Sequence, residues 1–296
     1  MKECYFCLSE RMTETSAQRK IQFDNQIFSF YRCGNCFGYS LYPKLSTEQI
    51  QNLYSLDYVK NLSSDEPTRS TDDTRRFVEL QLFLNSLPEN QKDSFLDYGC
   101  GADPSTFKIS QQCGLAPVGM EFSQDVRDAV MIKTGKKIYS RDDLMGSNEL
   151  FDIIFLGDVI EHLVNPEIEL ESLRRKLKVG GVLIAQGPLE GSWTLTHFVV
   201  ILFALLTRGK LSEFPPYHVS LATRRSMLKI MKSSGFKNVN IKCTEVTWPA
   251  PSLKLVISNP NPRNLIMLIC KGIDKTISKF IKGYGSRFFL TCEGES

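Results

Sequence analysis

Four cysteines near the N-terminus have the spacing of a metal site. Cys4 and Cys7 form one Cys-x-x-Cys pair, Cys33 and Cys36 form a second, and 25 residues separate the pairs. Two residues between thiolates let both sulfurs turn toward one ion, and four thiolates complete a closed tetrahedral zinc site. A closed site leaves no position for water, so we expect the ion to fold a small zinc ribbon and to do no chemistry.

A second group of chemistry-bearing residues follows a short apolar stretch. Residues 95–98 are typical of a strand, which leads into Gly99 and Gly101, and Glu121 stands twenty residues after Gly101. In open α/β sheets, ligands bind beyond the carboxyl ends of the strands, where small residues let backbone N–H groups approach them. An acidic side chain after the next strand accepts hydrogen bonds from ribose hydroxyls. The pattern predicts a pocket for an adenosine-containing cofactor.

The residues around this turn narrow the choice of cofactor. A dinucleotide-binding turn needs glycine or alanine where Pro104 stands, whereas Asp97 suits a cofactor with a cationic amino-acid end. Leu-Asp-Tyr-Gly-Cys-Gly, residues 96–101, resembles the first motif of the class I S-adenosylmethionine-dependent methyltransferases. Residues 151–163 are similar to the fourth-strand motif of that family, and the similarity extends over roughly residues 93–296. One departure is Asp103, which stands where the family usually has a third glycine.

The resemblance implies roles for individual residues. The implied cofactor-binding set comprises Asp97, Gly99, Gly101, Glu121, Asp142, Asp143, Leu144 and Asp158. Asp97 and the two glycines belong at the methionine end and Glu121 at the ribose. Asp142 or Asp143, with Leu144, belongs beside the adenine. Asp158 is expected to face both the methyl group and the acceptor, which makes it a catalytic candidate as well.

The histidines are the candidate bases. Methyl transfer from a sulfonium is an in-line displacement, so positioning supplies most of the catalysis. A hydroxyl acceptor must also lose a proton, and histidine titrates in the useful range. Of the three histidines, His218 beside Tyr217 is the favoured base. His162 is either a second catalytic residue or a support for the fold, and His197 lies in an apolar run typical of a core.

The elements that must position these residues alternate between strand and helix from Ser94 onward. A helix capped by Asn165 is expected to continue to Gly180, ahead of a strand at residues 182–186. Such alternation predicts a parallel, doubly wound sheet. Together with the resemblance, it predicts an α/β, Rossmann-like sheet of seven strands with the last one antiparallel, preceded by a small Cys4 zinc ribbon.

The expected domains follow from these assignments. The zinc ribbon takes residues 1–44, and connecting helices, whose start is marked by a capping box of Ser46 and Gln49, take residues 45–92. The methyltransferase domain takes residues 93–296, with an apolar insertion at 191–222.

Two segments of the expected methyltransferase domain are candidates for contact with lipid. Residues 191–207 carry no charged side chain, but they are shorter than the ~20 residues of a bilayer-spanning helix, so a lid over the acceptor site is expected. Residues 264–282 place isoleucines on one helical face and four lysines on another, namely Lys271, Lys275, Lys279 and Lys282. Such a helix can lie on an anionic membrane. The alternative is a helix that packs on the domain with solvated lysines.

Composition sets limits on partners and compartment. The net charge of +3 over 296 residues is too weak to predict nucleic-acid binding. No apolar run follows the first charged residues as in a signal peptide, and nine cysteines cannot all pair, so reduced thiols in the cytoplasm are expected. The protein is at most peripheral at the inner face of the membrane.

The predicted activity is methyl transfer from S-adenosylmethionine to a small molecule. Similar ribbons precede the methyltransferase fold in deoxysugar C-methyltransferases, which favours a sugar or lipid-linked glycan precursor as the acceptor. Two alternatives stay open: an RNA methyltransferase whose ribbon binds RNA, and a non-catalytic binding module on the same fold.

Overall fold

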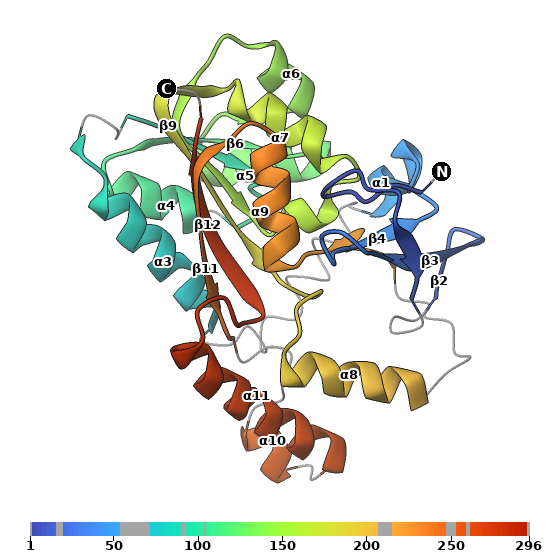
Figure 1. The fold of residues 1–296 in the computed structure, drawn as a ribbon. Coiled ribbons are helices and arrows are strands. Elements are labelled where there is room, and N and C mark those ends of the chain that lie inside the picture. The colour runs from blue at the N-terminus through green and yellow to red at the C-terminus, as the bar shows by residue number, and fades with distance from the viewer. Residues whose placement is uncertain are drawn as a thin grey trace.

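The computed structural model describes eight stretches of the chain. These are residues 2–15, 20–53, 72–89, 93–103, 105–206, 215–246, 253–258 and 261–294. Pro104, which bears on the choice of cofactor, lies outside them, as do residues 207–214 of the predicted insertion. The described stretches contain a large sheet and a small N-terminal sheet (Figure 1).

The large sheet has the predicted α/β topology. Its strands are β5 (Ser94–Tyr98), β6 (Ala116–Met120), β7 (Ile138–Tyr139), β8 (Phe151–Gly157), β9 (Leu177–Pro188), β11 (Lys237–Thr244) and β12 (Arg287–Glu293). Among the described residues these seven lie in the order β11-β12-β9-β8-β5-β6-β7. The pairs from β9 to β7 are parallel, and β12 runs antiparallel to both of its neighbours. The predicted Rossmann-like sheet, with its last strand antiparallel, is confirmed.

Helices cover both faces of this sheet. They are α3 (Asp72–Ser86), α4 (Ser105–Gln112), α5 (Gln124–Thr134), α6 (Arg141–Gly146), α7 (Pro166–Arg174) and α9 (Arg224–Ser233). Successive side chains of a strand point to opposite faces. Leu96 and Ile154 accordingly pack in one core cluster with residues of α7 and α9, whereas Phe95 and Ile153 share another cluster with Leu84 of α3. Figure 1 shows α7 and α9 on one side of the sheet and α3 on the other.

The boundary between α7 and β9 differs from the prediction. α7 ends at Arg174, and Leu177 already pairs with Phe151 as the first residue of β9. The spacing of Leu177 from Leu170 and Leu173 fits a helix, but an apolar spacing cannot by itself separate a last helical turn from the start of a buried strand. The expected helix to Gly180 was therefore wrong, and β9 is longer than the predicted strand at residues 182–186.

The N-terminal module is a small antiparallel sheet. Its strands are β1 (Met12–Glu14), β2 (Ile21–Phe23), β3 (Gln26–Cys33) and β4 (Tyr39–Tyr42). β2 and β3 form a hairpin around Asp24 and Asn25. These two residues have positive φ angles of 51° and 56°, as a tight turn between twisted strands requires.

A strand from the second half of the chain completes this small sheet. β10 (Ser220–Leu221) pairs with β4, so the small sheet has the order β1-β3-β4-β10 with β2 beside β3. Two hydrogen bonds extend the junction: Leu41 N–H donates to the Val219 carbonyl, and the Thr223 hydroxyl donates to the Cys36 carbonyl, each at 2.9 Å. The cysteine module is thereby joined to the segment that follows His218.

The predicted capping box opens the next helix. The Ser46 N–H donates to the Gln49 side-chain oxygen at 3.0 Å, and the Gln49 N–H donates back to the Ser46 hydroxyl at 3.1 Å. The helix that begins there is α1 (Thr47–Leu53). Both cap bonds satisfy N–H groups that the first turn of a helix leaves without partners.

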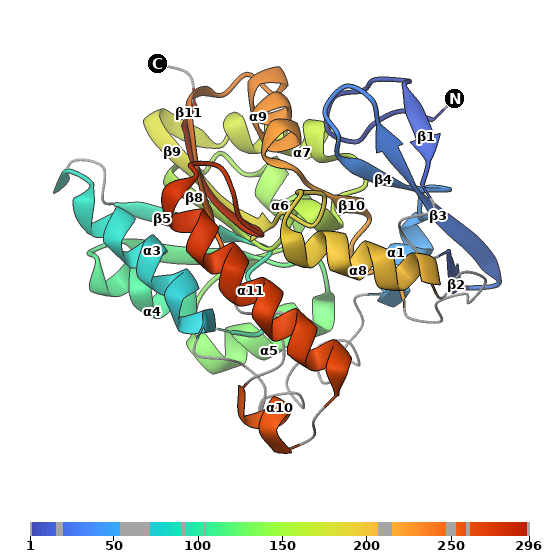
Figure 2. The ribbon, with the colours of Figure 1, turned by 60° about the horizontal axis from the view of Figure 1, so that its bottom comes forward.

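Two further helices lie side by side at the edge of the molecule (Figure 2). They are α8 (Leu195–Leu206) and α11 (Pro262–Phe280), and the short α10 (Leu253–Ser258) precedes α11. The buried carboxylate of Asp274 on α11 accepts hydrogen bonds from the N–H groups of Leu195 and Thr196, at 2.9 and 2.8 Å. It therefore holds the first turn of α8 against α11.

The outer surface of this helix pair is apolar. The exposed apolar side chains on the two helices are Phe198, Val200, Leu202, Leu265, Ile266, Ile269, Ile273 and Phe280. The prediction that Lys271 lies on a solvated basic face was wrong, because Lys271 is buried and its ammonium donates to the Glu245 carboxylate. None of the described helices is long and apolar enough to cross a membrane.

Candidate functional site

The glycine turn after β5 meets Glu121 at the end of β6. The N–H groups of Gly99 and Cys100 donate to the Met120 carbonyl at 2.8 and 3.0 Å. Gly101 N–H donates to the Glu121 carboxylate at 3.0 Å. Gly99 and Gly101 have φ angles of +79° and +58°, a region that glycine adopts without strain. The structure thus brings together three of the residues predicted to bind the cofactor.

Glu121 is held rigidly by the backbone. Its other carboxylate oxygen accepts from the N–H groups of Phe122 and Ser123, at 2.8 and 3.1 Å. Burial raises the pKa of Glu121, and the backbone donors act in the opposite direction because they stabilise the ionised form. A carboxylate fixed in this way can accept hydrogen bonds from two neighbouring hydroxyls.

Asp97 lies beneath the turn and points toward α4. It is only 3% exposed, and its carboxylate accepts a hydrogen bond from the Thr106 hydroxyl. Asp103 lies two residues before α4, where it accepts from the N–H and the hydroxyl of Ser105, at 3.0 and 2.6 Å. The residue that replaces the third glycine of the family motif therefore stabilises the start of α4.

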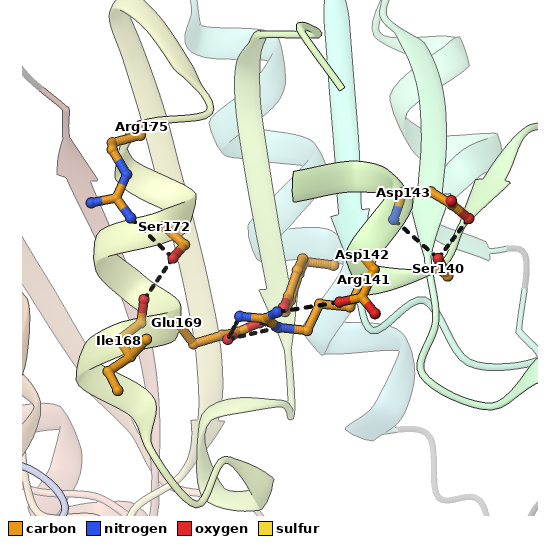
Figure 3. A network of polar contacts seen from close by, with 9 residues as sticks. Ser140, Arg141, Asp142, Asp143, Ile168, Glu169, Ser172 and Arg175 are labelled. Atoms are coloured by element: carbon orange, nitrogen blue, oxygen red, sulfur yellow. Dashed lines mark hydrogen bonds and ion pairs between the residues drawn. The ribbon is translucent and has the colours of Figure 1, made fainter. Parts of the chain in front are cut away.

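The two acidic side chains after β7 differ in their contacts. Asp143 accepts from the Ser140 hydroxyl at 2.6 Å and caps the start of α6 with it (Figure 3). Asp142 is almost fully exposed and lies 3.6 Å from the Arg141 guanidinium, which in turn makes a two-pronged ion pair with Glu169 of α7 (Figure 3). Leu144 is completely buried. Both carboxylates are exposed, and Asp142 is the one that is not hydrogen-bonded to the start of its own helix.

Asp158 occupies a tight corner at the end of β8. Its φ is +56°, its N–H donates to the Gln186 carbonyl at 2.9 Å, and its carboxylate accepts from Arg287 at 2.5 Å. Sequence reasoning did not find Arg287, because β12 brings it to this position from 129 residues away. The next residue, Val159, lies directly against Gly99. Asp158 therefore lies next to the residue that packs on the glycine turn, and its expected position facing the methyl group and the acceptor stays a prediction.

A carboxylate and two histidines gather beside Asp158. Glu161 and His162 belong to a short 3-10 turn, η3 (Ile160–His162), and His218 immediately precedes the segment that leads into β10. The rings of His162 and His218 are 5.0 Å apart between centroids and meet edge to face. One carboxylate oxygen of Glu161 and one nitrogen of each ring all lie within 4.8 Å of one another.

Each histidine is oriented through its Nδ1 atom. His162 Nδ1 lies 2.7 Å from the Tyr217 carbonyl, and His218 Nδ1 lies 2.6 Å from the Glu190 carboxylate. Both partners only accept hydrogen bonds, so both Nδ1 atoms carry a proton and each Nε2 carries the lone pair when its ring is neutral. Glu190 was not predicted, because nothing in the sequence pairs it with a histidine 28 residues away.

Burial and neighbouring charges give the three groups different pKa values. Burial, reinforced by His218, lowers the pKa of His162 to about 4. Burial also acts to lower that of His218, but the hydrogen bond to Glu190 and the nearby carboxylates raise its pKa to about 9. Burial, followed by the charge of Asp158, raises the pKa of Glu161 to about 8. Perturbed groups of this kind gather at functional sites.

The third histidine is separate from this group. His197 lies on α8, where its backbone N–H donates to the Thr194 hydroxyl at 3.1 Å, and burial lowers its pKa.

Glu161 could have been found from the sequence, because it directly precedes His162 and stands three residues after Asp158. Residues three and four apart share one side of a helix, so the spacing alone brings Glu161 and His162 near Asp158, although Asp158, with a φ of +56°, precedes the 3-10 turn.

The four N-terminal cysteines form one cluster of sulfurs. Sγ of Cys4 lies 3.4 Å from that of Cys36, Sγ of Cys7 lies 3.7 Å from that of Cys33, and all four lie within 4.8 Å of one another. Four sulfurs that ligate one zinc ion at ~2.3 Å are ~3.8 Å apart, so the cluster has the size of a Cys4 site. Backbone N–H groups of Asn35 and Cys36 donate to the Cys33 sulfur at 3.3 and 3.5 Å.

The seven-stranded sheet and the glycine turn after β5 define a class I S-adenosylmethionine-dependent methyltransferase. The sequence model of a methyltransferase-domain family matches residues 73–241, more than half of the chain, so the protein belongs to that family. The enzymatic prediction is thereby confirmed, and the alternative of a non-catalytic module is set aside. No curated protein sequence matches the chain at a significant level.

Solved structures share the fold at low sequence identity. A methyltransferase from Archaeoglobus fulgidus described as SAM-dependent is 17% identical, with a TM-score of 0.49, over 78% of this chain and 98% of its own. Phosphoethanolamine N-methyltransferase 2 of Haemonchus contortus, solved with S-adenosyl-L-methionine, is 11% identical, with a TM-score of 0.52, over 94% and 71%. A chain of the Haloferax volcanii complex that contains the Trm112 methyltransferase activator is 11% identical, with a TM-score of 0.51, over 80% and 98%.

Proposed function

We propose that the enzyme methylates a hydroxyl group of a sugar or lipid-linked glycan precursor at a membrane surface. The observation that carries this proposal is the position of Asp158, His162 and His218 beside the glycine turn, which gives an oxygen acceptor both hydrogen-bond partners and a base. The apolar outer face of α8 and α11 supplies a place for a lipid tail.

The cofactor roles follow from the turn itself. We propose that Gly99 and Gly101 approach the methionine end, that Asp97 stabilises its positive charge, and that Glu121 binds the ribose hydroxyls. A side chain at Gly101 would point into open space, with no atom within 4 Å of its Cβ, so there is room for a ligand above the turn. Bound S-adenosylmethionine supplies a methyl group on a cationic sulfur. When the methyl group is transferred, the sulfur keeps the electron pair of the broken carbon–sulfur bond.

The adenine is proposed to bind beside α6, the short helix that follows β7. Leu144 is buried under the start of α6 and shapes the floor of that region, while Asp142 and Asp143 line its rim. The exposed carboxylate of Asp142 is the better placed of the two to accept a hydrogen bond from an exocyclic amine.

The acceptor side needs a group that removes a proton. We propose that His218 Nε2 takes the proton of the acceptor hydroxyl once the ring has lost the proton that its raised pKa of about 9 keeps on it near pH 7, while Glu190 holds Nδ1 and so fixes the ring. His162 has a lowered pKa and is neutral near pH 7, so it can orient the hydroxyl without competing for the proton. Asp158, held by Arg287, completes the polar wall.

The N-terminal cluster is proposed to hold a structural zinc ion on Cys4, Cys7, Cys33 and Cys36. The sulfur separations and the N–H groups directed at Cys33 support this assignment. The zinc ribbon is taken as residues 1–44, followed by connecting helices to residue 92 and the methyltransferase domain at 93–296 with its insertion at 191–222. The ribbon organises the acceptor side, because β10 and its neighbour Val219 are hydrogen-bonded to β4.

Membrane contact is proposed through segments 193–207 and 264–282. Trp193 and Phe280 are 63% and 82% exposed, and exposed aromatic and isoleucine side chains on two adjacent helices bind lipid through buried apolar area. Lys279 and Lys282 are exposed at the C-terminal end of α11, beside Phe280, and would add attraction to anionic lipid. These exposed side chains support the proposal that the enzyme works at the inner face of the membrane.

The substrate class is tested by labelling. Purified enzyme is incubated with S-adenosylmethionine carrying a labelled methyl group and with separate fractions of lipid-linked glycans, nucleotide sugars and RNA. We expect label in a glycan fraction, stable to RNase. Label that appears only in RNA, with binding that weakens steeply as salt rises, would replace the sugar proposal with the RNA methyltransferase.

A further inference from the structure

Glu161, His162 and His218 have the composition of a metal-binding triad. One carboxylate oxygen and two imidazole nitrogens lie within 4.8 Å of one another, apart from the Cys4 cluster. Ligand atoms around a single ion at ~2.1 Å are ~3.0–3.5 Å apart. The triad therefore closes on an ion by side-chain movements on the order of 1 Å, without a change in the backbone.

The hydrogen bonds of the two rings match those of metal-bound histidines. A histidine that binds metal through one nitrogen usually donates its other N–H to a carbonyl or a carboxylate, which fixes the ring. His162 makes this bond to the Tyr217 carbonyl and His218 makes it to the Glu190 carboxylate, so both present Nε2 as the ligand atom. Two different classes of outer partner thus orient the two rings of one cluster.

Glu161 supplies an independent indication that a cation belongs here. The residue is only 3% exposed, and its Oε1 atom has no hydrogen-bond partner within the described residues. A buried carboxylate oxygen without a partner is strongly unfavourable unless a proton or a cation compensates it. Its other oxygen lies close to β9, because a Cβ at Gly187 would come within 3.2 Å of Glu161 Oε2.

We infer that Glu161, His162 and His218 bind a divalent transition-metal ion, with coordination positions left open toward the acceptor. Two imidazoles and one carboxylate suit Mn²⁺, Fe²⁺, Co²⁺ or Zn²⁺, and three protein ligands leave room for further oxygen ligands. The Cys4 cluster is of the opposite kind, since four thiolates close the coordination sphere. The chain therefore offers one site of the structural type and one of the reactive type.

The position of the triad suggests what the open positions receive. η3 directly follows Asp158 and Val159, and Val159 touches the glycine turn. An ion at the triad would hold one or two oxygen atoms of the acceptor, such as a pair of neighbouring hydroxyls, in front of the cofactor. This assignment of the acceptor rests on the proposed function, whereas the metal site does not. With the ion bound, His218 is a ligand, and its role as a free base applies to the metal-free enzyme alone.

The site is tested by Mn²⁺ titration of the full-length protein prepared with one zinc ion per chain, which the four thiolates hold, and the electron paramagnetic resonance signal of free Mn²⁺ is the readout. Mn²⁺ prefers oxygen and imidazole ligands to thiolates, so the Cys4 cluster does not interfere. We expect one Mn²⁺ bound per chain. We expect Glu161→Gln and His218→Asn each to weaken binding at least about tenfold, as the loss of a ligand should exceed the effect of an outer-shell change. His197→Asn is the matched control and should bind Mn²⁺ like the unmodified protein.

A second measurement needs no substitution at the cluster. In the unmodified protein with labelled histidines, substoichiometric Mn²⁺ should broaden the ring signals of His162 and His218 first. No uptake at millimolar Mn²⁺, or equal binding by the Glu161 variant and the His197 control when both are folded, would overturn the inference. Because binding is measured without acceptor or cofactor, its failure is distinct from a failure of the proposed glycan substrate.

Discussion

The two glycines of the cofactor turn allow a paired test, because a methyl group added at each would meet different surroundings. At Gly99 the new Cβ would lie 2.7 Å from a methyl carbon of the buried Val159, and φ is +79°. The left-handed conformation costs an alanine about 1–2 kcal/mol. Overpacking against Val159 adds about 1–3 kcal/mol. Gly99→Ala should therefore lower the free energy of unfolding by about 2–5 kcal/mol.

Gly101→Ala should separate binding from stability. Its φ of +58° brings the same backbone penalty of about 1–2 kcal/mol, but its Cβ meets no atom within 4 Å, so overpacking is absent. The open space beside it is the proposed place of the cofactor. We expect this variant to weaken S-adenosylmethionine binding at least about tenfold, a change of about 1.4 kcal/mol.

Urea unfolding and calorimetric titration with S-adenosylmethionine measure the two effects separately. The expected pattern is a large loss of stability for Gly99→Ala, and a small loss of stability with a clear loss of affinity for Gly101→Ala. Equal destabilisation by the two substitutions would refute the packing argument. Unchanged affinity in Gly101→Ala would show that the cofactor does not lie above this turn.

Three further predictions follow from single contacts. Glu121→Gln removes a charged acceptor worth about 1.5–3 kcal/mol, so the Kd for S-adenosylmethionine should rise roughly 10- to 100-fold in the same titration; a value near that of the unmodified enzyme would contradict the ribose assignment. Cys33→Ser should release zinc, measured with a colorimetric chelator, while Cys243→Ser, outside the cluster, should retain it; zinc loss from both, or from neither, would argue against a Cys4 site. Lys271→Met leaves the Glu245 carboxylate buried without its cation, so the free energy of unfolding should fall by about 3–5 kcal/mol. Adding Glu245→Leu to this variant should restore most of the lost stability. A double variant as unstable as the single one would disprove the role of the ion pair.

Local signals in the sequence predicted most of the fold. The glycine turn and the capping box of Ser46 and Gln49 appear as expected, because each is determined by residues a few positions apart. Alternation of strands and helices, together with the family resemblance, predicted the seven-stranded, mostly parallel sheet, whereas the order of its strands comes from the structure. The end of α7 was missed since a leucine spacing fits both a helix and the strand that replaces it.

The contacts that complete the site depend on pairing across the folded chain. Asp158 was predicted, but its partner Arg287 arrives on an antiparallel strand from the far end of the sequence. His218 was predicted, but the Glu190 that orients it was not. Lys271 has the spacing of a solvated face, yet it is buried beside Glu245, because it lies on the side of α11 that is buried together with Met267, Cys270 and Asp274. The spacing of residues predicts which side chains share a helical face. It does not predict whether that face contacts solvent or a buried partner from another part of the chain.

The pairing of β10 with β4 determines when the N-terminal sheet can finish folding during synthesis of the chain. The cysteine module is made early, but its sheet closes only when residues 220–221 have been synthesised. Until then the edge of β4 has backbone groups without their final partners, and an unpaired strand edge is prone to associate with other chains. A nascent or truncated chain that stops short of Ser220 therefore carries an aggregation-prone edge at its N-terminal end, and the completed protein removes it with two residues.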